Sequence, residues 1–257
     1  PLKPMAPRFF VPSPLAPFAA GGPFALPPGC ARHVQVLRLQ PGDELTLFDG
    51  HGGEWHASVE HMGRSDVSVR LVEHRAVSRE LGFDVTLALG MPANDRMDGL
   101  VEKATELGAA AIQPLVCERS VLRLAGERAD KKVAHWQAVA TAASEQCGRT
   151  RVPTVHAVRS LSDWLRGLAA EADSFEGGAC QRRVLSLREG RGWQSAAAVP
   201  GQRFVFLSGP EGGLSEAEES AALQCGFEPL SLGARVLRAD TAPLAVLAAL
   251  GLQAGAR

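Results

Sequence analysis

Apolar and polar residues alternate along four short runs in the first third of the chain. Alternation with a period of two places one side of a strand in a core and the other side in solvent. The sequence therefore predicts strands of a small β-barrel at residues 8–11, 44–50, 54–59 and 66–71. We expect a short helix over 30–39 and a loop over 12–29, which is rich in proline, alanine and glycine.

The pattern changes near residue 83, where apolar strand-like runs begin to alternate with helical periodicity. Such alternation is typical of an α/β fold with a parallel sheet. Strands are predicted at 83–89, 111–116, 154–158, 184–187, 203–207 and 230–233. Helices are predicted at 98–107, 130–147, 162–168 and 242–252. We therefore divide the chain into a barrel domain, residues 1–76, and an α/β domain, residues 77–257.

Composition narrows the possible classes of protein. Of 257 residues, 46% are hydrophobic and 21% are charged, which is ordinary for a globular protein. The formal net charge of -1 gives no overall basic surplus, so any contact with RNA must be local. No run approaches the roughly 18 apolar residues that span a bilayer, and residues 1–8 lack the apolar core of a secretory signal. We expect a cytoplasmic protein without a membrane partner.

Cysteine and histidine are dispersed along the chain. The five cysteines form no CxxC pair, and none of the seven histidines lies in an HExxH or HxxxH spacing. We expect reduced thiols and no metal site.

The segment 208–215 (SGPEGGLS) follows the predicted strand 203–207. Its three glycines let a ligand approach bare backbone N–H and C=O groups. Ser215 and Glu218 have the spacing of a capping box, so a helix is expected to begin at Ser215. The segment matches neither the P-loop nor the GxGxxG pattern, which disfavours a nucleoside triphosphate. A strand-to-helix turn without a ligand is the alternative interpretation.

A second loop follows the last predicted strand. Leu232 and Gly233 end that strand, residues 234–237 form a short connection, and Asp240 or Thr241 is expected to cap the final helix. In open α/β sheets, ligands bind beyond the carboxyl ends of the strands. Two such loops side by side would form a backbone-lined pocket for a small neutral or cationic ligand.

Several further motifs occur in a fixed order along nearly the whole chain. They are RFF at 8–10, DRM at 95–97, KATELG at 103–108, EQCGR at 145–149, GPEGG at 209–213, LG at 232–233 and TA at 241–242. This order resembles the RsmE-type methyltransferases of the SPOUT superfamily, which methylate N3 of a uridine in 16S ribosomal RNA. The chain departs from that pattern at 239–242, where Ala-Asp-Thr-Ala replaces the usual Thr-Glu-Thr-Ala.

The resemblance implies a fold, a cofactor and partners. The fold is α/β, with a PUA-like RNA-binding β-barrel followed by a SPOUT domain that carries a deep trefoil knot around a parallel sheet. The methyl donor is S-adenosylmethionine, and the substrate is 16S ribosomal RNA or the small ribosomal subunit. The resemblance also implies a homodimer. Periodicity alone gives no sign of a knot, because knotted chains are rare.

The same resemblance assigns the donor-binding residues. They are Leu207, Ser208, Gly209, Glu211, Gly212, Leu232, Gly233, Val236, Leu237, Arg238, Thr241 and Ala242.

The reaction requires further groups, because uridine N3 carries a proton at neutral pH and must lose it. Arg149 is our candidate for stabilising the negative charge on the uracil oxygens, with a surface phosphate contact as the alternative. Glu145 is the candidate proton acceptor, and Glu211 and Asp240 are others. Each of these carboxylates could equally be a helix cap or an ion-pair partner.

Base pairing buries N3, so the target uridine must be unpaired or flipped out. Candidate RNA contacts are Arg8, Arg32, Arg38, Lys103 and Arg119. Lys103 could instead lie on a solvated helix face with Glu102 and Glu106.

Two other functions fit part of this pattern. A knotted methyltransferase could act on a ribose 2'-hydroxyl or a tRNA base. An assembly factor could bind RNA with a vestigial donor pocket, but the intact glycines at 209, 212 and 213 argue against it.

Overall fold

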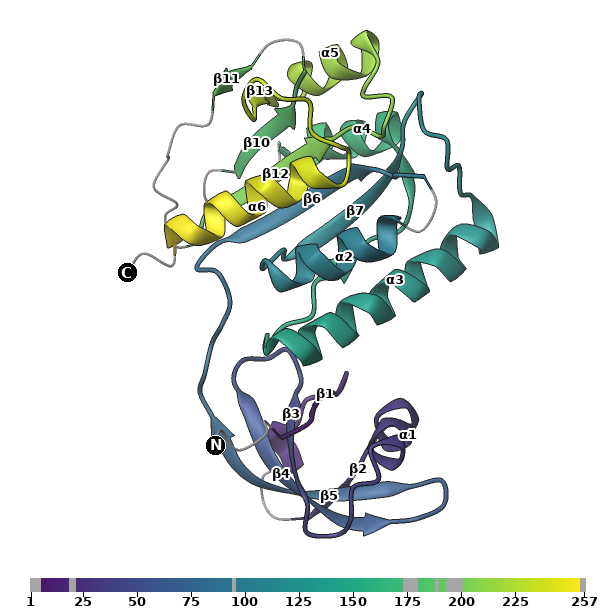
Figure 1. Ribbon diagram of the computed structural model, residues 1–257, viewed down its shortest axis with the longest axis vertical. Coiled ribbons are helices and arrows are strands. Elements are labelled where there is room, and N and C mark those ends of the chain that lie inside the picture. Colours follow the sequence, from purple (N-terminus) through teal and green to yellow (C-terminus); the bar gives the residue numbers. More distant parts are fainter. Residues whose placement is uncertain are drawn as a thin grey trace. The chain divides into compact units, whose positions relative to one another are not determined.

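The computed structural model describes residues 6–18, 22–93, 96–172, 180–187, 190–192 and 201–254. The chain forms two compact units (Figure 1). Unit 1 comprises Pro1–Glu80 and Ser144–Val152, and unit 2 comprises Leu81–Ala143 and Pro153–Arg257. The division predicted after residue 76 lies close to the first of these boundaries. The return of 144–152 to unit 1 was not predicted.

Unit 1 contains a five-stranded sheet in the order β1-β3-β4-β5-β2. Strand β1 pairs with β3 in parallel, and the other neighbours are antiparallel. The strands are β1 (Arg8–Phe10), β2 (Pro23–Ala25), β3 (Glu44–Phe48), β4 (Glu54–Met62) and β5 (Val67–Arg75). Alternating side chains of these strands form one apolar core, as the period of two predicts.

The prediction of an unbroken loop over 12–29 is wrong. A 3-10 helix occupies Ala16–Phe18, and β2 pairs with β5 at the edge of the sheet. Phe24 of β2 is 6% exposed and belongs to the apolar core. Proline is uncommon within strands, so Pro23 argues against a strand in the sequence. It is tolerated here because it is the first residue of an edge strand.

The short helix of unit 1 is α1 (Pro28–Val36), which begins two residues before the predicted helix and ends three residues earlier. Proline at the start of a helix costs little, because the first N–H groups have no partner within the helix. Arg38 has a φ of 57°, in the left-handed region, so the chain leaves the helix there. Ala31 and Val34 face the core of unit 1.

Unit 2 contains an eight-stranded sheet. Strands β11-β13-β10-β12-β6-β7-β8 follow one another across it, and β9 also pairs with β7. Every pairing in it is parallel, which confirms the predicted parallel sheet. The strands are β6 (Asp84–Gly90), β7 (Ala111–Val116), β8 (Thr154–Val155), β9 (Arg159–Ser160), β10 (Cys180–Leu185), β11 (Arg191–Gly192), β12 (Arg203–Ser208) and β13 (Glu228–Ser231).

Helices pack on both faces of this sheet, with α2 against α6 and α4 against α5 (Figure 1). They are α2 (Arg96–Glu106), α3 (Gly126–Cys147), α4 (Leu161–Ala172), α5 (Glu216–Gln224) and α6 (Thr241–Ala254). Trp136 of α3 is 1% exposed and donates a hydrogen bond to Asp98, 3.0 Å away, so it is a core residue. The sequence also predicts an insertion relative to the family over 175–181, of which residues 175–179 lie outside the described part of the chain.

Strands β13, β10 and β12 are neighbours in the sheet. Because they are parallel, their carboxyl ends meet at one edge. Both loops that the sequence singles out leave the sheet from this edge.

Candidate functional site

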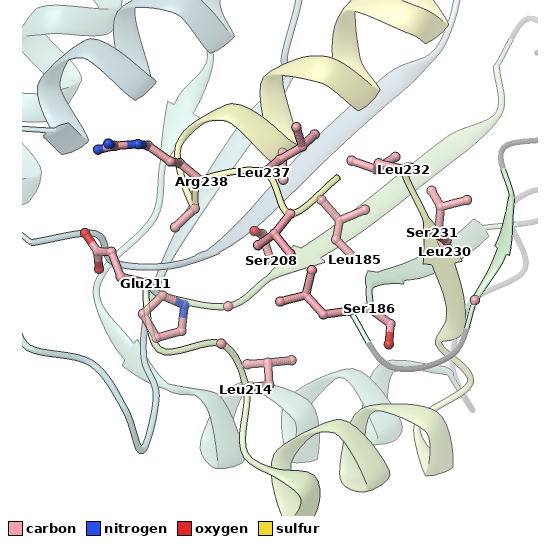
Figure 2. A pocket seen from close by; sticks show the side chains of 18 of the residues that line it. Leu185, Ser186, Ser208, Glu211, Leu214, Leu230, Ser231, Leu232, Leu237 and Arg238 are labelled. Carbon is pink, nitrogen blue, oxygen red and sulfur yellow. The ribbon is translucent and has the colours of Figure 1, made fainter. Parts of the chain in front are cut away.

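A cavity of about 630 Å³ lies in unit 2 beyond the carboxyl ends of β10, β12 and β13 (Figure 2). Three chain segments form most of its wall: 185–187, 208–214 and 230–239. Arg96, Arg119, Gly190, Glu219 and Ala242 complete the lining. The volume lies within the range of small-molecule and cofactor sites.

The β12–α5 loop, residues 209–214, requires glycine where two backbone segments lie too close together for a side chain. A Cβ atom on Gly209 would lie 2.8 Å from the backbone nitrogen of Leu214, because the loop folds back on itself. A Cβ atom on Gly90 of β6 would lie 2.5 Å from the backbone nitrogen of Pro210. Gly213 has a φ of +69°, which disfavours other residues. The glycines therefore shape this wall of the cavity.

Side chains from elsewhere in unit 2 hold the β12–α5 loop in place. Arg119 Nη1 donates to the carbonyl oxygens of Gly212, at 3.0 Å, and Leu214, at 3.4 Å. The carboxylate of Glu211 accepts a hydrogen bond of 2.9 Å from the backbone of Ala93 and lies 3.4 Å from Arg96 Nη1. The loop is thus anchored on both sides.

The start of α5 carries the predicted capping box. Ser215 accepts a hydrogen bond from the backbone of Glu218, and the Glu218 side chain accepts one from the backbone of Ser215. The other carboxylate oxygen of Glu218 accepts a hydrogen bond of 2.7 Å from the backbone of Glu118. This link ties α5 to the segment after β7.

The second loop runs from β13 to α6. Gly233 has a φ of +100°, a backbone conformation that glycine adopts more readily than other residues. Helix α6 begins at Thr241, and the backbone nitrogens of Thr241 and Ala242 both donate to the carbonyl of Arg238. Asp240 directly precedes the helix, yet its buried Oδ1 has no hydrogen-bond partner among the described residues. The predicted cap through Asp240 therefore does not involve this atom.

The lining combines apolar side chains, backbone groups, two carboxylates and four arginines. Leu185, Leu187, Leu230, Leu232 and Leu237 supply the apolar part. Glu211 and Glu219 also line the cavity, and Ser186 hydrogen-bonds to Glu219. Such a wall suits a ligand with an apolar ring and with polar and charged edges.

Most residues predicted to hold the cofactor lie at this cavity. The predicted residues that line it are Ser208, Gly209, Glu211, Gly212, Leu232, Gly233, Val236, Leu237, Arg238 and Ala242. Leu207 and Thr241 do not line it, and Leu207 is fully buried in β12.

The sequence reasoning missed the contribution of β10. Leu185 and Ser186 lie at its carboxyl end and line the cavity between the two glycine loops (Figure 2). The backbone of Ser186 donates to the carbonyl of Leu230, at 3.0 Å. A strand was predicted here, but no local pattern shows that it pairs with β12 and β13.

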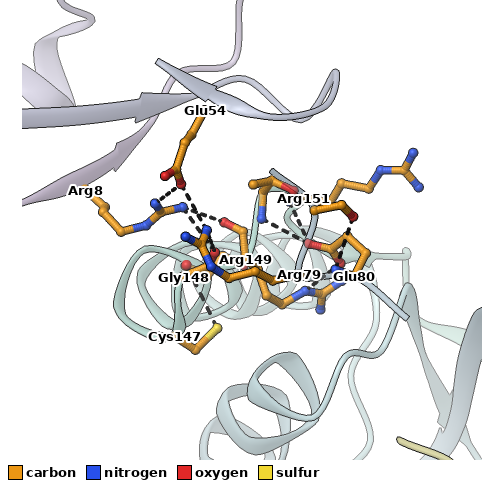
Figure 3. Close-up of polar contacts among 11 residues, drawn as sticks. Arg8, Glu54, Arg79, Glu80, Cys147, Gly148, Arg149 and Arg151 are labelled. Atoms are coloured by element: carbon orange, nitrogen blue, oxygen red, sulfur yellow. Dashed lines mark hydrogen bonds and ion pairs between the residues drawn. The ribbon is translucent and has the colours of Figure 1, made fainter. Parts of the chain in front are cut away.

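Arg149 lies in unit 1, and its side chain is buried (Figure 3). Its Nε donates to the Glu80 carboxylate at 2.9 Å, and Nη2 contacts the same oxygen. The other oxygen of Glu80 accepts hydrogen bonds from the backbone of Thr150, at 3.0 Å, and Arg151, at 3.2 Å. Glu80 therefore holds the segment 149–151 within unit 1.

Arg8 forms a second buried group in unit 1. Its side chain, 6% exposed, pairs with Glu54 and donates to the carbonyl oxygen of Arg149, at 3.0 Å. Arg79 donates to the same Glu54 carboxylate, at 3.0 Å, and to the carbonyl of Gly148, at 2.9 Å. Burial opposes ionisation of Glu54, but hydrogen bonds from Arg79 and Arg8 outweigh it and lower its pKa.

Glu145 also lies in unit 1, where its carboxylate accepts a 2.9 Å hydrogen bond from the backbone of Phe10. Burial raises the pKa of Glu145, and the hydrogen bond from Phe10 offsets part of this effect. Neither Glu145 nor Arg149 is among the residues that line the cavity. Their catalytic roles stay predictions.

The remaining candidate RNA contacts are exposed. Arg32 and Arg38 lie on and just after α1. Lys103 hydrogen-bonds to Glu102 and Glu106, 2.7 and 2.8 Å away, and these bonds raise its pKa. These contacts match the alternative interpretation, in which Lys103 lies on a solvated helix face with Glu102 and Glu106. RNA binding by Lys103 therefore also stays a prediction.

Two negative observations concern only the described residues. Their His, Cys, Asp and Glu side chains form no group of three or more that could hold a metal ion. None of their helices is both long and apolar enough to cross a membrane.

Comparison with known proteins shows two matching family models. A model described as an RNA methyltransferase domain matches residues 79–251. A model described as an RNA methyltransferase PUA domain matches residues 31–72. The two models therefore match most of unit 2 and the central part of unit 1.

Two curated relatives are each named Ribosomal RNA small subunit methyltransferase E. The Synechocystis protein is 36% identical over 214 residues, which are 83% of this chain and 67% of that protein. The Bacillus subtilis protein is 33% identical over 230 residues, which are 86% of each chain.

A crystal structure of the protein of the same name from Neisseria gonorrhoeae, bound to S-adenosyl methionine, is also similar. It matches with a TM-score of 0.84 and 34% identity, over 96% of this chain and 97% of that one. With a family model across most of the chain and relatives above 30% identity over most of their length, the chain belongs to the ribosomal RNA small subunit methyltransferase E family, a family of RNA methyltransferases.

Proposed function

We propose that this enzyme transfers a methyl group from S-adenosylmethionine to N3 of a uridine in 16S ribosomal RNA, forming 3-methyluridine. The observation that carries the proposal is the glycine-walled cavity beyond β10, β12 and β13. Family membership and a similar protein that binds S-adenosyl methionine support the same conclusion. The substrate is the RNA of the small ribosomal subunit, which implies a cytoplasmic enzyme.

The lining of the cavity fits this donor. Leucine side chains at the ends of β10 and β13 can pack against the adenine ring, while the backbone of the two loops offers hydrogen bonds to its edge. Glu211 and Glu219 can face the cationic sulfonium and ammonium groups of the donor. The donor supplies an electrophilic methyl group. The protein therefore has to orient that methyl group and the acceptor nitrogen.

The acceptor must lose its N3 proton for the reaction to proceed. From the sequence we propose Arg149 as the group that stabilises the uracil anion and Glu145 as the proton acceptor. Their partners in unit 1 support a different role, in which they hold the segment 144–152 to the five-stranded sheet. Substitutions of Arg149 and Glu145 distinguish the two roles.

Three finer features of the proposal rest on the family. The SPOUT domain would form a deep trefoil knot, the PUA-like unit would bind RNA, and the protein would be a homodimer. Exposed Arg32 and Arg38 support RNA binding by unit 1. Exposed Val236 and Leu252, each 78% exposed, support an apolar protein interface on unit 2.

One experiment tests the proposed reaction against its alternatives. Undermethylated small ribosomal subunits are incubated with the protein and labelled donor, and the digested RNA is analysed by mass spectrometry. We expect labelled 3-methyluridine. A 2'-O-methylated nucleoside, or no labelled nucleoside at all, would contradict the proposal.

A further inference from the structure

Four arginines line the donor cavity, and they fall into two pairs. Arg96 and Arg119 have partners within the wall: Arg96 lies beside Glu211, and Arg119 donates to two loop carbonyls. The second pair, Arg235 and Arg238, lies on the loop between β13 and α6. The two pairs differ in whether their guanidinium groups already contact other residues of the protein.

The side chains of Arg235 and Arg238 have no hydrogen bond or ion pair with any residue that the structure describes. Both residues are exposed. Figure 2 shows the guanidinium group of Arg238 directed away from Ser208 and Leu185, toward the side of the cavity where Glu211 lies. That carboxylate already accepts a hydrogen bond from Ala93 and faces Arg96. Two cationic groups are therefore available at the edge of the cavity.

We propose that Arg235 and Arg238 bind the RNA phosphates that flank the target uridine. This inference rests on the proposed function, because it places the RNA at the donor cavity. A guanidinium group forms paired hydrogen bonds to phosphate oxygens and stays charged at any physiological pH. A flipped base can enter the cavity only if its own backbone lies at the edge. Arginines on a cavity-lining loop are in position for that contact.

Arg238 and Arg119 thereby take different roles from those predicted from the sequence. Arg238 was assigned to the donor and Arg119 to RNA. Arg119 donates hydrogen bonds to the carbonyl oxygens of Gly212 and Leu214, so its structural role is to position the β12–α5 loop. Arg238, whose side chain has no partner among the described residues, takes the RNA contact.

The test compares Arg235→Gln, Arg238→Gln and the double variant with Arg128→Gln. Arg128 is an exposed arginine of α3 that does not line the cavity, so the control removes the same charge from the same unit. The affinity for undermethylated small ribosomal subunits is measured at several salt concentrations and constant magnesium. Donor affinity is measured by calorimetry for every variant.

Each phosphate contact contributes about 0.7 to 0.9 to the slope of log affinity against log salt. We expect each single variant to lower the slope by about this amount and to weaken RNA binding about fivefold at 0.1 M salt. The double variant should lose both contributions, while Arg128→Gln and all donor affinities stay unchanged. Unchanged RNA affinity and slope in the double variant would overturn the inference, as would a selective loss of donor affinity.

The wild-type protein separates this inference from the proposed function. If wild type forms no 3-methyluridine, the proposed reaction fails whatever the arginines do. If wild type forms 3-methyluridine and the double variant binds subunits like wild type, only the phosphate contact fails.

Discussion

The proposed donor cavity of unit 2 and the carboxylate–arginine cluster of unit 1, which comprises Arg8, Glu54, Arg79, Glu80 and Arg149, are built in different ways. The cavity lies at the ends of three adjacent strands, and three of its five lining glycines, at 209, 212 and 213, fall within one five-residue segment. In the cluster, the Arg149 side chain contacts Glu80, 69 residues away in the sequence, and the Arg8 side chain donates to the backbone carbonyl of Arg149, 141 residues away. A glycine loop can therefore be recognised locally, whereas the role of an arginine depends on distant partners.

The largest effect on stability is expected from Arg149→Ala, which leaves the Glu80 carboxylate, 11% exposed, without its guanidinium partner. Removing one partner of a buried ion pair costs about 3 kcal/mol or more. We expect this loss in urea unfolding at pH 7. Arg151→Ala, which removes a neighbouring exposed side chain, should change stability by less than about 0.5 kcal/mol.

The same variant tests the catalytic role predicted for Arg149. An Arg149→Ala protein as stable as wild type, with normal donor affinity and no turnover, would contradict the structural role and support the catalytic one.

The next largest effect concerns the cavity. Gly209→Ala places a methyl group 2.8 Å from the backbone nitrogen of Leu214, so the β12–α5 loop must shift. A strain of about 2 kcal/mol corresponds to about a 30-fold loss of affinity for S-adenosylmethionine, measured by calorimetry. The matched control is Gly99→Ala in α2, where an added Cβ meets nothing within 4 Å. Equal donor affinity in both variants would show that this loop does not hold the donor.

Arg119→Ala should have a smaller effect on the same measurement. It removes two hydrogen bonds to loop carbonyls, and the expected loss of donor affinity is about fivefold, or about 1 kcal/mol. Arg128→Ala serves as the control. If Arg119→Ala instead lowers the salt dependence of RNA binding and leaves donor affinity intact, the sequence-based assignment to RNA is correct.

The smallest effect is expected from Glu145→Gln. Burial raises the pKa of Glu145, so the folded protein favours the protonated form and loses stability as pH rises through the raised folded pKa. Glutamine keeps an acceptor for the backbone of Phe10 and carries no charge. The variant should therefore be slightly more stable than wild type at pH 7 and indistinguishable at low pH.

Turnover of Glu145→Gln decides its chemical role. Near-normal turnover fits a structural carboxylate, whereas complete loss of turnover with a stable fold would identify Glu145 as the proton acceptor.

The sequence predicted the parts of the molecule that follow from local patterns. The parallel sheet of unit 2, the capping box at Ser215 and a pocket between the two loops required only periodicity, glycine positions and strand ends, whereas the donor-binding residues were assigned by family resemblance. Strand β2 was missed because its short sequence begins with proline and its pairing with β5 is not local.

Contacts between residues far apart in the sequence account for the other features that the sequence did not predict. The return of 144–152 to unit 1 depends on Glu54, Arg79 and Glu80. The contribution of Ser186 depends on where β10 lies in the sheet, between β12 and β13. No spacing within the sequence encodes either arrangement, so family resemblance and periodicity could not supply them.

A crystal structure of this protein with S-adenosylmethionine would show directly where the donor binds. We expect one donor per chain, in contact with the ends of β10 and β12 and with the loop between β13 and α6. A donor bound outside this cavity, or within unit 1, would contradict the central claim.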